Sequence, residues 1–267
     1  MVFLIIISTI VLLFFVLEYS ILVPKIKGLR VLMYHKIESV IPQDFLTVST
    51  QQLEQHFQIL QQKNYNCISL QDLIDYQLFQ KPLPKNPFLL TLDDGYNNNL
   101  TQLYPLLLKY NYKAVIFLVA EFINSDARNK TGKRIYLSVD EIKQMKPDVV
   151  EFALHSFDHK SYNNLSIIEI QTDIQKTKQN FDNLGIKYLP CHAYTYGAFP
   201  KKDEAKRNEM YKILSQNNIE LAFRIGGRVN KLPLENPYLI RRIDIRGTDS
   251  IFQFRAKLRT GRSKLFG

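Results

Sequence analysis

The chain has 267 residues, a length that suits one large domain. Hydrophobic residues make up 46% of it, with 17 Phe and 15 Tyr, so an ordinary globular class fits. The two cysteines, Cys67 and Cys191, are too few for a disulfide framework. The formal net charge is +10, and nucleic acid is the usual partner of a basic chain, but no nucleic-acid-binding motif occurs and we predict no such partner.

Residues 1–23 form the first distinct segment. Residues 2–17 carry no charge, and the apolar stretch approaches the roughly 20 residues that span a bilayer. We predict one N-terminal transmembrane helix, an uncleaved anchor, and hence a membrane localisation. A cleaved signal peptide is the alternative, although neither a basic n-region nor a small-x-small cleavage site is visible. Lys25, Lys27 and Arg30 favour a cytoplasmic domain, but long C-terminal domains translocate despite such charges, so the facing side stays open.

Apolar, β-branched runs alternate with helical patterns over residues 24–247, which we predict to be one domain. Three helical patterns open with capping-box spacing, at Ser69, Ser138 and Ser166. Alternating strands and helices indicate an α/β domain with a largely parallel sheet, and the number of strands favours closure into a barrel. The predicted strands are residues 29–34, 66–68, 88–92, 114–119, 149–154, 192–196, 221–225 and 239–245.

Residues 248–267 are predicted to form a basic C-terminal tail. Cationic residues such as Arg255 and Arg259 are interleaved there with Phe252 and Leu258. This pattern suggests an amphipathic tail that lies on an anionic membrane surface. A solvated surface tail is the alternative, and the sequence leaves both open.

Two short motifs carry most of the chemistry. Residues 91–96 (TLDDGY) contain the adjacent carboxylates Asp93 and Asp94, and His155 and His159 stand at an i, i+4 spacing in the sequence HSFDH. A metal hydrolase needs two imidazoles and one carboxylate to hold the ion and one further carboxylate to move a proton. Taken alone, strand-end aspartates often begin turns, and histidines are common on surfaces. Both motifs follow predicted strands, however, and the carboxyl ends of parallel barrel strands are where active sites assemble.

These motifs resemble those of a known family. Residues 91–96 are similar to the T-F-D-D-G-Y motif of the polysaccharide deacetylases (NodB homology, carbohydrate esterase family four), and residues 155–159 to the family's H-S/T-x-x-H metal motif. Further similar segments are residues 32–35, 104–107, 113–118 and 193–197. The first and last of these resemble the poly-N-acetylglucosamine deacetylases, a subgroup whose barrel is circularly permuted. The resemblance covers about residues 29–245 and implies a distorted (β/α) barrel of about seven strands.

The resemblance implies a role for each residue of the site. Asp94, His155 and His159 would hold a divalent metal ion, most often Zn²⁺ in this family. Asp93 would be the general base that takes a proton from the attacking water. The backbone N–H of Tyr196 would help to stabilise the oxyanion.

A general acid for the leaving amine must come from elsewhere. His35 is our candidate, since the permuted subgroup has a histidine in this place; the alternative is a core histidine beside Tyr34. No histidine follows His192, so the late histidine acid of unpermuted members is absent. The chain also departs from the family's Arg-x-Pro-Tyr-Gly segment, because Ala193 and Thr195 stand where the arginine and the proline would fall.

Four further residues are weaker candidates for binding or orienting the substrate. Ser156 would hydrogen-bond within the metal loop, and Tyr194 belongs to the turn before Tyr196. His192 either lines the pocket or is buried for structural reasons. Arg242 either orients Asp93 or makes a surface salt bridge.

We therefore predict a metal-dependent hydrolase that removes acetyl groups from N-acetylated hexosamine in a polysaccharide or lipid-linked glycan of a bacterial cell envelope. The N-terminal helix and the basic tail would hold it to the membrane. An O-acetyl sugar esterase with the same metal centre and a carbohydrate-binding pseudoenzyme are the alternatives. The intact set of carboxylates and histidines argues against the pseudoenzyme.

Overall fold

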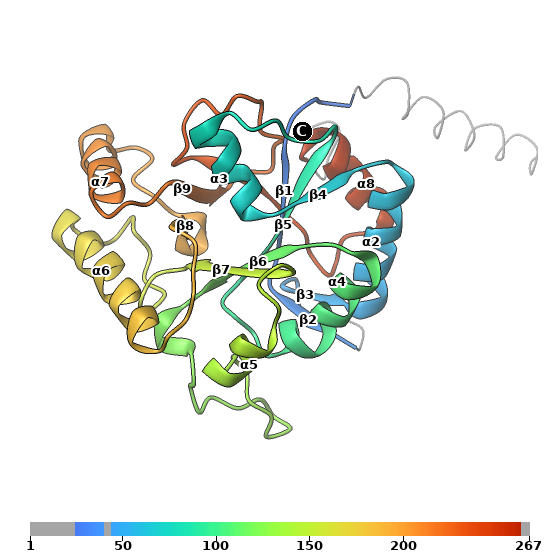
Figure 1. Ribbon diagram of the computed structural model, residues 1–267, viewed down its shortest axis with the longest axis horizontal. Helices are drawn as coiled ribbons and strands as arrows, with labels where there is room; N and C mark the ends of the chain where they lie inside the picture. The colour runs from blue at the N-terminus through green and yellow to red at the C-terminus, as the bar shows by residue number, and fades with distance from the viewer. Residues whose placement is uncertain (1–24, 40–43, 263–267) are drawn as a thin grey trace, which may run out of the picture.

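The structure is a computed structural model that describes residues 25–39 and 44–262 (Figure 1). Its strands run parallel around a barrel. The strand β1 (Arg30–Tyr34) pairs with β10 (Ile240–Asp244) on one side and with β5 (Pro87–Asp93) on the other. From β5 the ring continues through β6 (Ala114–Leu118), β7 (Val150–Leu154), β8 (Cys191–Ala193) and β9 (Leu221–Ile225) to β10. Within the described residues, seven strands close a parallel barrel, which confirms the predicted α/β barrel.

Three short strands complete the described sheet structure. β4 (Asn66–Ile68) pairs with the first half of β5, and β6 pairs with the second half of β5 along the same edge. β2 (Lys36–Glu38) and β3 (Thr47–Ser49) form a separate two-stranded sheet. The sequence analysis predicted β4 but neither β2 nor β3.

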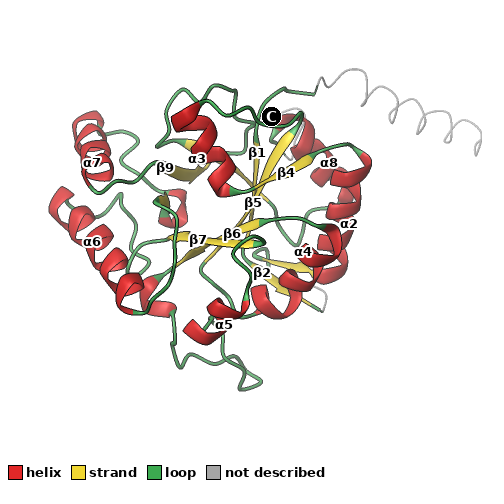
Figure 2. Ribbon diagram, viewed as in Figure 1, coloured by secondary structure: helices red, strands yellow, loops and turns green. Residues whose placement is uncertain are grey.

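Helices surround the barrel (Figure 2). The capping boxes predicted at Ser69, Ser138 and Ser166 are present, each side chain accepting a hydrogen bond from the backbone N–H three residues on. The α-helices are α2 (Thr50–Gln62), α3 (Leu70–Phe79), α4 (Tyr104–Tyr110), α5 (Val139–Gln144), α6 (Ile167–Asn183), α7 (Glu204–Gln216) and α8 (Ile251–Thr260). Shorter helical turns are η1 (Asn99–Leu103), η2 (Ala120–Phe122) and η3 (Thr195–Gly197).

Side chains of opposite strands meet inside the barrel. The rings of Phe117 on β6 and Phe223 on β9 lie 5.3 Å apart, although these strands are not neighbours in the sheet. Because successive strand residues point to opposite faces, Leu92 and Leu118 instead face the helices and join the larger apolar cluster. The interior is thus filled, and chemistry is confined to the rim.

The predicted membrane localisation requires a correction. In residues 25–39 and 44–262, no helix is both long enough and apolar enough to cross a membrane. This finding contradicts the predicted localisation by a single N-terminal span. The segment that was assigned to the span, residues 1–23, lies outside the described residues.

Most of the predicted C-terminal tail belongs to the folded domain. The described part contains α8, whose Phe254 and Leu258 are buried in the larger apolar cluster. The guanidinium of Arg30 and the hydroxyl of Tyr65 both donate to the carbonyl oxygen of Leu258. The interleaved apolar residues therefore form the core-facing side of a helix, with Arg255 on its exposed side.

Candidate metal centre

The two sequence motifs meet at the carboxyl ends of β5 and β7. Asp93 is the last residue of β5, and His155 directly follows β7. The carboxylate of Asp94 and the imidazoles of His155 and His159 offer ligand atoms that all lie within 4.8 Å of one another. The Oδ1 atom of Asp94 is 3.4 Å from Nε2 of His155 and 3.2 Å from Nε2 of His159.

These donors fit a divalent metal ion. Four N and O donors in tetrahedral coordination at about 2.0–2.1 Å stand roughly 3.3 Å apart, close to the two distances from Oδ1 of Asp94 to the histidines. Oδ1 of Asp94 is buried and has no hydrogen-bond partner among the described residues. A buried acceptor of this kind is costly unless something compensates it, and a cation would do so.

The ring nitrogens of His155 and His159 that face away from the centre each have a hydrogen-bond partner. Nδ1 of His155 lies 2.7 Å from the carbonyl oxygen of Ala193, which can only accept, so Nδ1 carries a proton and, in the neutral form of the ring, Nε2 offers a lone pair. Nδ1 of His159 lies 3.1 Å from the hydroxyl of Tyr196. Partners of this kind fix the orientation of metal-binding histidines.

Strained backbone conformations gather at this site. Asp94, Ser156, His159 and Tyr196 all have positive φ, between 57° and 71°. Such conformations cost about 1–3 kcal/mol each and persist where the surroundings hold them. The hydroxyl of Ser156 accepts from the N–H of His159 at 2.9 Å, a hydrogen bond within the loop that carries both histidines. Gly95 also has φ of +70°, and a Cβ there would lie 2.6 Å from the side chain of Leu118.

Both carboxylates are held in the ionised form. Burial raises the pKa of Asp93, but the charges of Arg242, His155 and His35 together outweigh it and the pKa falls below its usual value. Burial likewise raises the pKa of Asp94, but the imidazoles of His155 and His159 close to its Oδ1 atom bring it well below the usual range. The centre is therefore anionic at neutral pH and attracts a cation.

Arg242 makes a buried ion pair with Asp93. Its Nη1 and Nη2 atoms donate to Oδ1 and Oδ2 at 2.5 and 2.8 Å. Both side chains are buried, so the contact is not a surface salt bridge. Arg242 lies on β10 and Asp93 on β5, so the pair spans the two strands that flank β1.

His35 lies on the other side of Asp93. Its Nε2 atom is 3.9 Å from Oδ2 of Asp93, and its side chain is 13% exposed. The amide of Asn99 donates to the backbone carbonyl of His35 at 3.0 Å and fixes the chain just beyond β1. The structure thus brings a histidine to the rim, beside the carboxylate, where it remains accessible.

Two of the weaker candidates are not brought into the site. Strand alternation turns His192 away from the barrel interior; it is fully buried and stacks on Tyr162, with ring centroids 4.8 Å apart. Burial, chiefly, lowers the pKa of His192 to about 3, so the ring is neutral. Tyr194 is also fully buried, and its hydroxyl donates to the carbonyl of Tyr238. Neither side chain can reach a substrate at the rim.

Tyr196, by contrast, is 67% exposed and stands beside the centre. Its ring centroid lies 4.7 Å from that of His159. Gly197 follows it with φ of +62°, and a Cβ there would lie 2.5 Å from the side chain of Ile225, so only glycine fits this turn. Thr195, which stands where the family has proline, is fully buried and donates to the carbonyl of Lys160 at 2.5 Å.

Sequence reasoning missed Asp173 of α6. Its two carboxylate oxygens accept from the backbone N–H of Phe157 at 2.9 Å and from the hydroxyl of Tyr162 at 2.6 Å. It therefore supports the loop that carries both histidines. The signal was present: Asp173 interrupts the apolar stripe of Ile170 and Ile174, where a lone carboxylate needs a partner.

Comparisons with known proteins agree with this site. A family model described as polysaccharide deacetylase matches residues 80–210. The chain is 28% identical over 171 residues to a Bacillus subtilis protein named "Putative polysaccharide deacetylase YxkH", covering 64% of this chain and 57% of that protein. It is 25% identical over 139 residues to the poly-beta-1,6-N-acetyl-D-glucosamine N-deacetylase of Escherichia coli K12, covering 49% of this chain and 21% of that protein. The chain thus spans less than two thirds of the length of either relative.

Solved structures share the fold. The Streptococcus pyogenes deacetylase PplD, solved with acetate, matches with a TM-score of 0.72 at 20% identity, covering 89% of this chain and 99% of that one. IcaB from Ammonifex degensii matches with a TM-score of 0.70 at 20% identity, covering 88% and 97%. At this identity the likeness shows the fold alone. The family match and the curated relatives identify residues 80–210, the segment that carries both motifs, as a polysaccharide deacetylase domain, the domain of a family of hydrolases.

Proposed function

We propose that this protein is a metal-dependent deacetylase that removes the acetyl group from N-acetylated hexosamine in a polysaccharide. The observation that carries the proposal is the convergence of Asp94, His155 and His159 beside a second, separately held carboxylate, Asp93. The name of the Escherichia coli relative, a poly-N-acetylglucosamine N-deacetylase, supports the substrate class.

The metal would be held by Asp94, His155 and His159, and we propose Zn²⁺ because two imidazoles and one carboxylate suit it. When bound there, the ion would polarise the acetyl carbonyl and lower the pKa of a water molecule towards neutrality. The residues of the chain supply the proton transfers and the orientation.

Asp93 would act as the general base. Its Oδ2 atom lies 3.7 Å from Nε2 of His155, so it borders the ligand cluster without belonging to it. The attacking water gives its proton to this carboxylate while its oxygen bonds to the acetyl carbon. Arg242 holds both carboxylate oxygens and so keeps the base in one orientation. General base catalysis of this kind contributes about 10²–10⁴-fold in rate.

His35 would act as the general acid. An amine leaves only once it is protonated, so the C–N bond breaks as an imidazolium proton passes to the nitrogen. Nε2 of His35 lies 3.9 Å from Oδ2 of Asp93, so the proposed acid and the proposed base would act on the same reacting group. The products are acetate and the free amine. The backbone N–H of Tyr196, on the exposed turn beside His159, would donate to the oxyanion.

The test is acetate release from N-acetylglucosamine oligomers by the purified protein. We expect turnover to stop when a chelator removes the metal and to return when Zn²⁺ is added back. Asp93→Asn should lower kcat by about 10²–10⁴-fold while the metal content stays unchanged. Asp140→Asn, which changes an exposed carboxylate at the start of α5, is the matched control.

Three results would count against this function. Turnover that survives complete metal removal would exclude the metal mechanism, and undiminished turnover by Asp93→Asn would exclude the base. Faster acetate release from an O-acetylated sugar than from the N-acetylated one would identify an esterase instead.

A further inference from the structure

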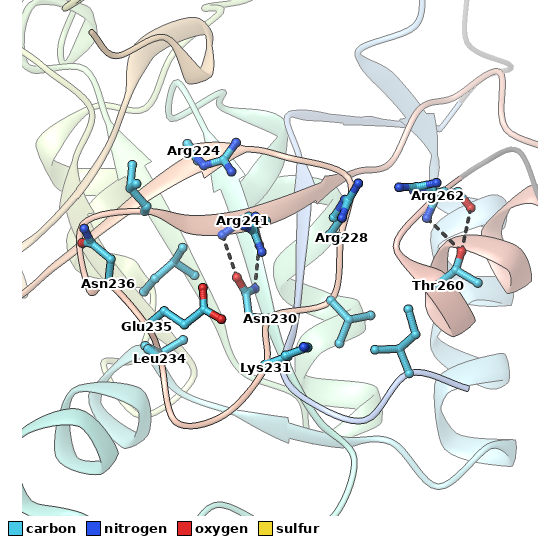
Figure 3. Close-up of a pocket in the computed structure, with 14 residues that line it drawn as sticks. Arg224, Arg228, Asn230, Lys231, Leu234, Glu235, Asn236, Arg241, Thr260 and Arg262 are labelled. Atoms are coloured by element: carbon cyan, nitrogen blue, oxygen red, sulfur yellow. Dashed lines mark hydrogen bonds between the residues drawn. The ribbon is translucent and has the colours of Figure 1, made fainter. Parts of the chain in front are cut away.

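A basic pocket lies on the outer face of β9 and β10 (Figure 3). It has a volume of about 500 Å³ and is bordered by the segment between these strands and by residues just after α8. Five cationic side chains line it, against one carboxylate, that of Glu235. The cations are Arg224, Arg228, Lys231, Arg241 and Arg262.

The floor of the pocket places two arginines side by side. Arg224 on β9 and Arg241 on β10 are register partners on adjacent parallel strands. Their neighbour Arg242 points into the barrel to Asp93, so Arg241 points outward by strand alternation. Like charges directly opposite each other destabilise a sheet, so this pair costs free energy unless an anion lies between or above the two side chains.

The carboxylates of the described residues do not relieve this cost. Within the described residues, none of the five cations has a carboxylate oxygen within 4.0 Å, and this includes Glu235. The Nε atom of Arg224 is buried without a hydrogen-bond partner in that part of the chain. Burial, and then the charges of Arg241 and Arg228, lower the pKa of Arg224.

The pocket floor is rigid. The side chain of Asn230 accepts from the backbone N–H of Arg241 and donates to its carbonyl, each at 2.8 Å. Asn230 is itself paired with Leu29 through backbone hydrogen bonds. A Cβ on Gly226 would lie 2.9 Å from the side chain of Arg241 and 3.2 Å from Nη1 of Arg224, so only glycine admits both side chains here. The backbone that carries Arg241 is therefore held in place before a ligand arrives.

We propose that this pocket binds a phosphate group carried by a small molecule such as a sugar phosphate. Guanidinium groups present parallel N–H donors that match two phosphate oxygens, and they keep their charge at any physiological pH. A volume of about 500 Å³ exceeds that of phosphate alone and lies in the range of small-molecule sites. The exposed Lys231 and Arg262 at the rim attract the anion from solution.

Calorimetric titration of the intact protein tests this, with glucose 6-phosphate, inorganic phosphate and glucose as probes, all at one ionic strength set with sodium chloride. We expect glucose 6-phosphate to bind and glucose not to bind. Arg224→Gln and Arg241→Gln should each weaken binding about tenfold to a hundredfold, as expected for the loss of hydrogen bonds to a charged group. Arg255→Gln, an exposed arginine of α8 outside the pocket, should leave the affinity unchanged.

The melting temperature in sodium chloride gives a second readout. Because each variant removes one member of the like-charged pair, Arg224→Gln and Arg241→Gln should not lower it, which separates loss of binding from loss of fold. Inorganic phosphate binding as tightly as glucose 6-phosphate would assign the pocket to free phosphate. Equal affinity of the variants and the wild type, or equal binding of glucose, would overturn the proposal. No turnover is needed, so the result does not depend on the deacetylase activity.

Discussion

Arg242 and Asp93 combine two requirements of a general base in one contact. The bidentate pair fixes the plane of the carboxylate, and the positive charge keeps it ionised although both groups are buried. Lysine carries the same charge but cannot present two parallel donors. Removal of one partner of a buried ion pair leaves an uncompensated charge, which costs about 3–5 kcal/mol.

We expect Arg242→Lys to lower kcat about 10²-fold with little change in KM, because the charge remains and the orientation of Asp93 is lost. Steady-state acetate release, with metal content measured in parallel, gives both constants. The control is Arg255→Lys, the same substitution at an exposed arginine of α8. A purely structural role would predict a lower melting temperature with kcat unchanged, and that result would refute the positioning role.

His56 makes stability depend on pH. It is buried, stacks on Phe254 with ring centroids 3.8 Å apart, and contacts the hydroxyl of Tyr34 through Nδ1. Burial first, and the charge of Lys257 second, lower its pKa to about 3. The unfolded chain, with an ordinary histidine pKa near 6.5, therefore binds a proton at a higher pH than the folded chain does.

The neutral His56 ring therefore makes its full contribution to the free energy of unfolding above about pH 6.5. This contribution is lost as the pH falls towards 3. Between pH 6.5 and 5 the loss amounts to about 2 kcal/mol. Urea unfolding at several pH values should show a shallower acid slope for His56→Gln than for the wild type. The slope is the readout, because the substitution also changes the packing. Parallel slopes for both proteins would show that His56 titrates normally.

At the scale of elements, α6 supports the loop that follows β7. Asp173 connects the helix to the backbone N–H of Phe157, midway between the two candidate ligand histidines, and Tyr162 holds its second oxygen. Groups that hold metal ligands in place typically contribute 10–100-fold to metal affinity. The helix thus contributes to the centre without offering a ligand.

Asp173→Ala should weaken Zn²⁺ binding about 10–100-fold, measured by competition with a chelating dye. Asp173→Asn should retain much of the affinity, since its amide oxygen can still accept from the N–H of Phe157. Asp182→Asn, a carboxylate on the last turn of the same helix, serves as the control. Identical affinities for Asp173→Ala and the wild type would mean that the loop is held without α6.

The elements also show where sequence reasoning succeeds. The barrel strands were predictable because buried parallel strands are continuous apolar runs, and the motifs at their ends placed Asp93 and His155 at one rim. The roles of His192 and Arg242 were left open, because each depends on which face of its strand turns inward, and β8 is only three residues long. The α8 helix was predicted as part of a basic amphipathic tail, because arginines interleaved with apolar residues fit a helix on a membrane surface as well as a helix packed on the core.

At the scale of the molecule, the barrel brings distant segments to one point. The candidate ligands come from the ends of β5 and β7, the base is held by β10, and the candidate acid follows β1. An unfolded chain has no such cluster, so a metal ion that binds the folded site stabilises the whole fold by a free energy that grows with the logarithm of its affinity. Metal binding should therefore raise the free energy of unfolding, and this increase can be measured without an activity assay.

We expect the melting temperature to rise with free Zn²⁺ concentration. At 100 times the dissociation constant the gain is about 2.7 kcal/mol, which corresponds to roughly 5–10 °C for a domain of this size. Differential scanning calorimetry after chelation and after Zn²⁺ titration measures it. His159→Ala should abolish most of the rise, because it removes one of three candidate ligands, whereas Asp140→Asn should retain it. A rise of equal size in His159→Ala would place the stabilising metal elsewhere on the chain, since the partly exposed His159 is the ligand whose loss disturbs the core least.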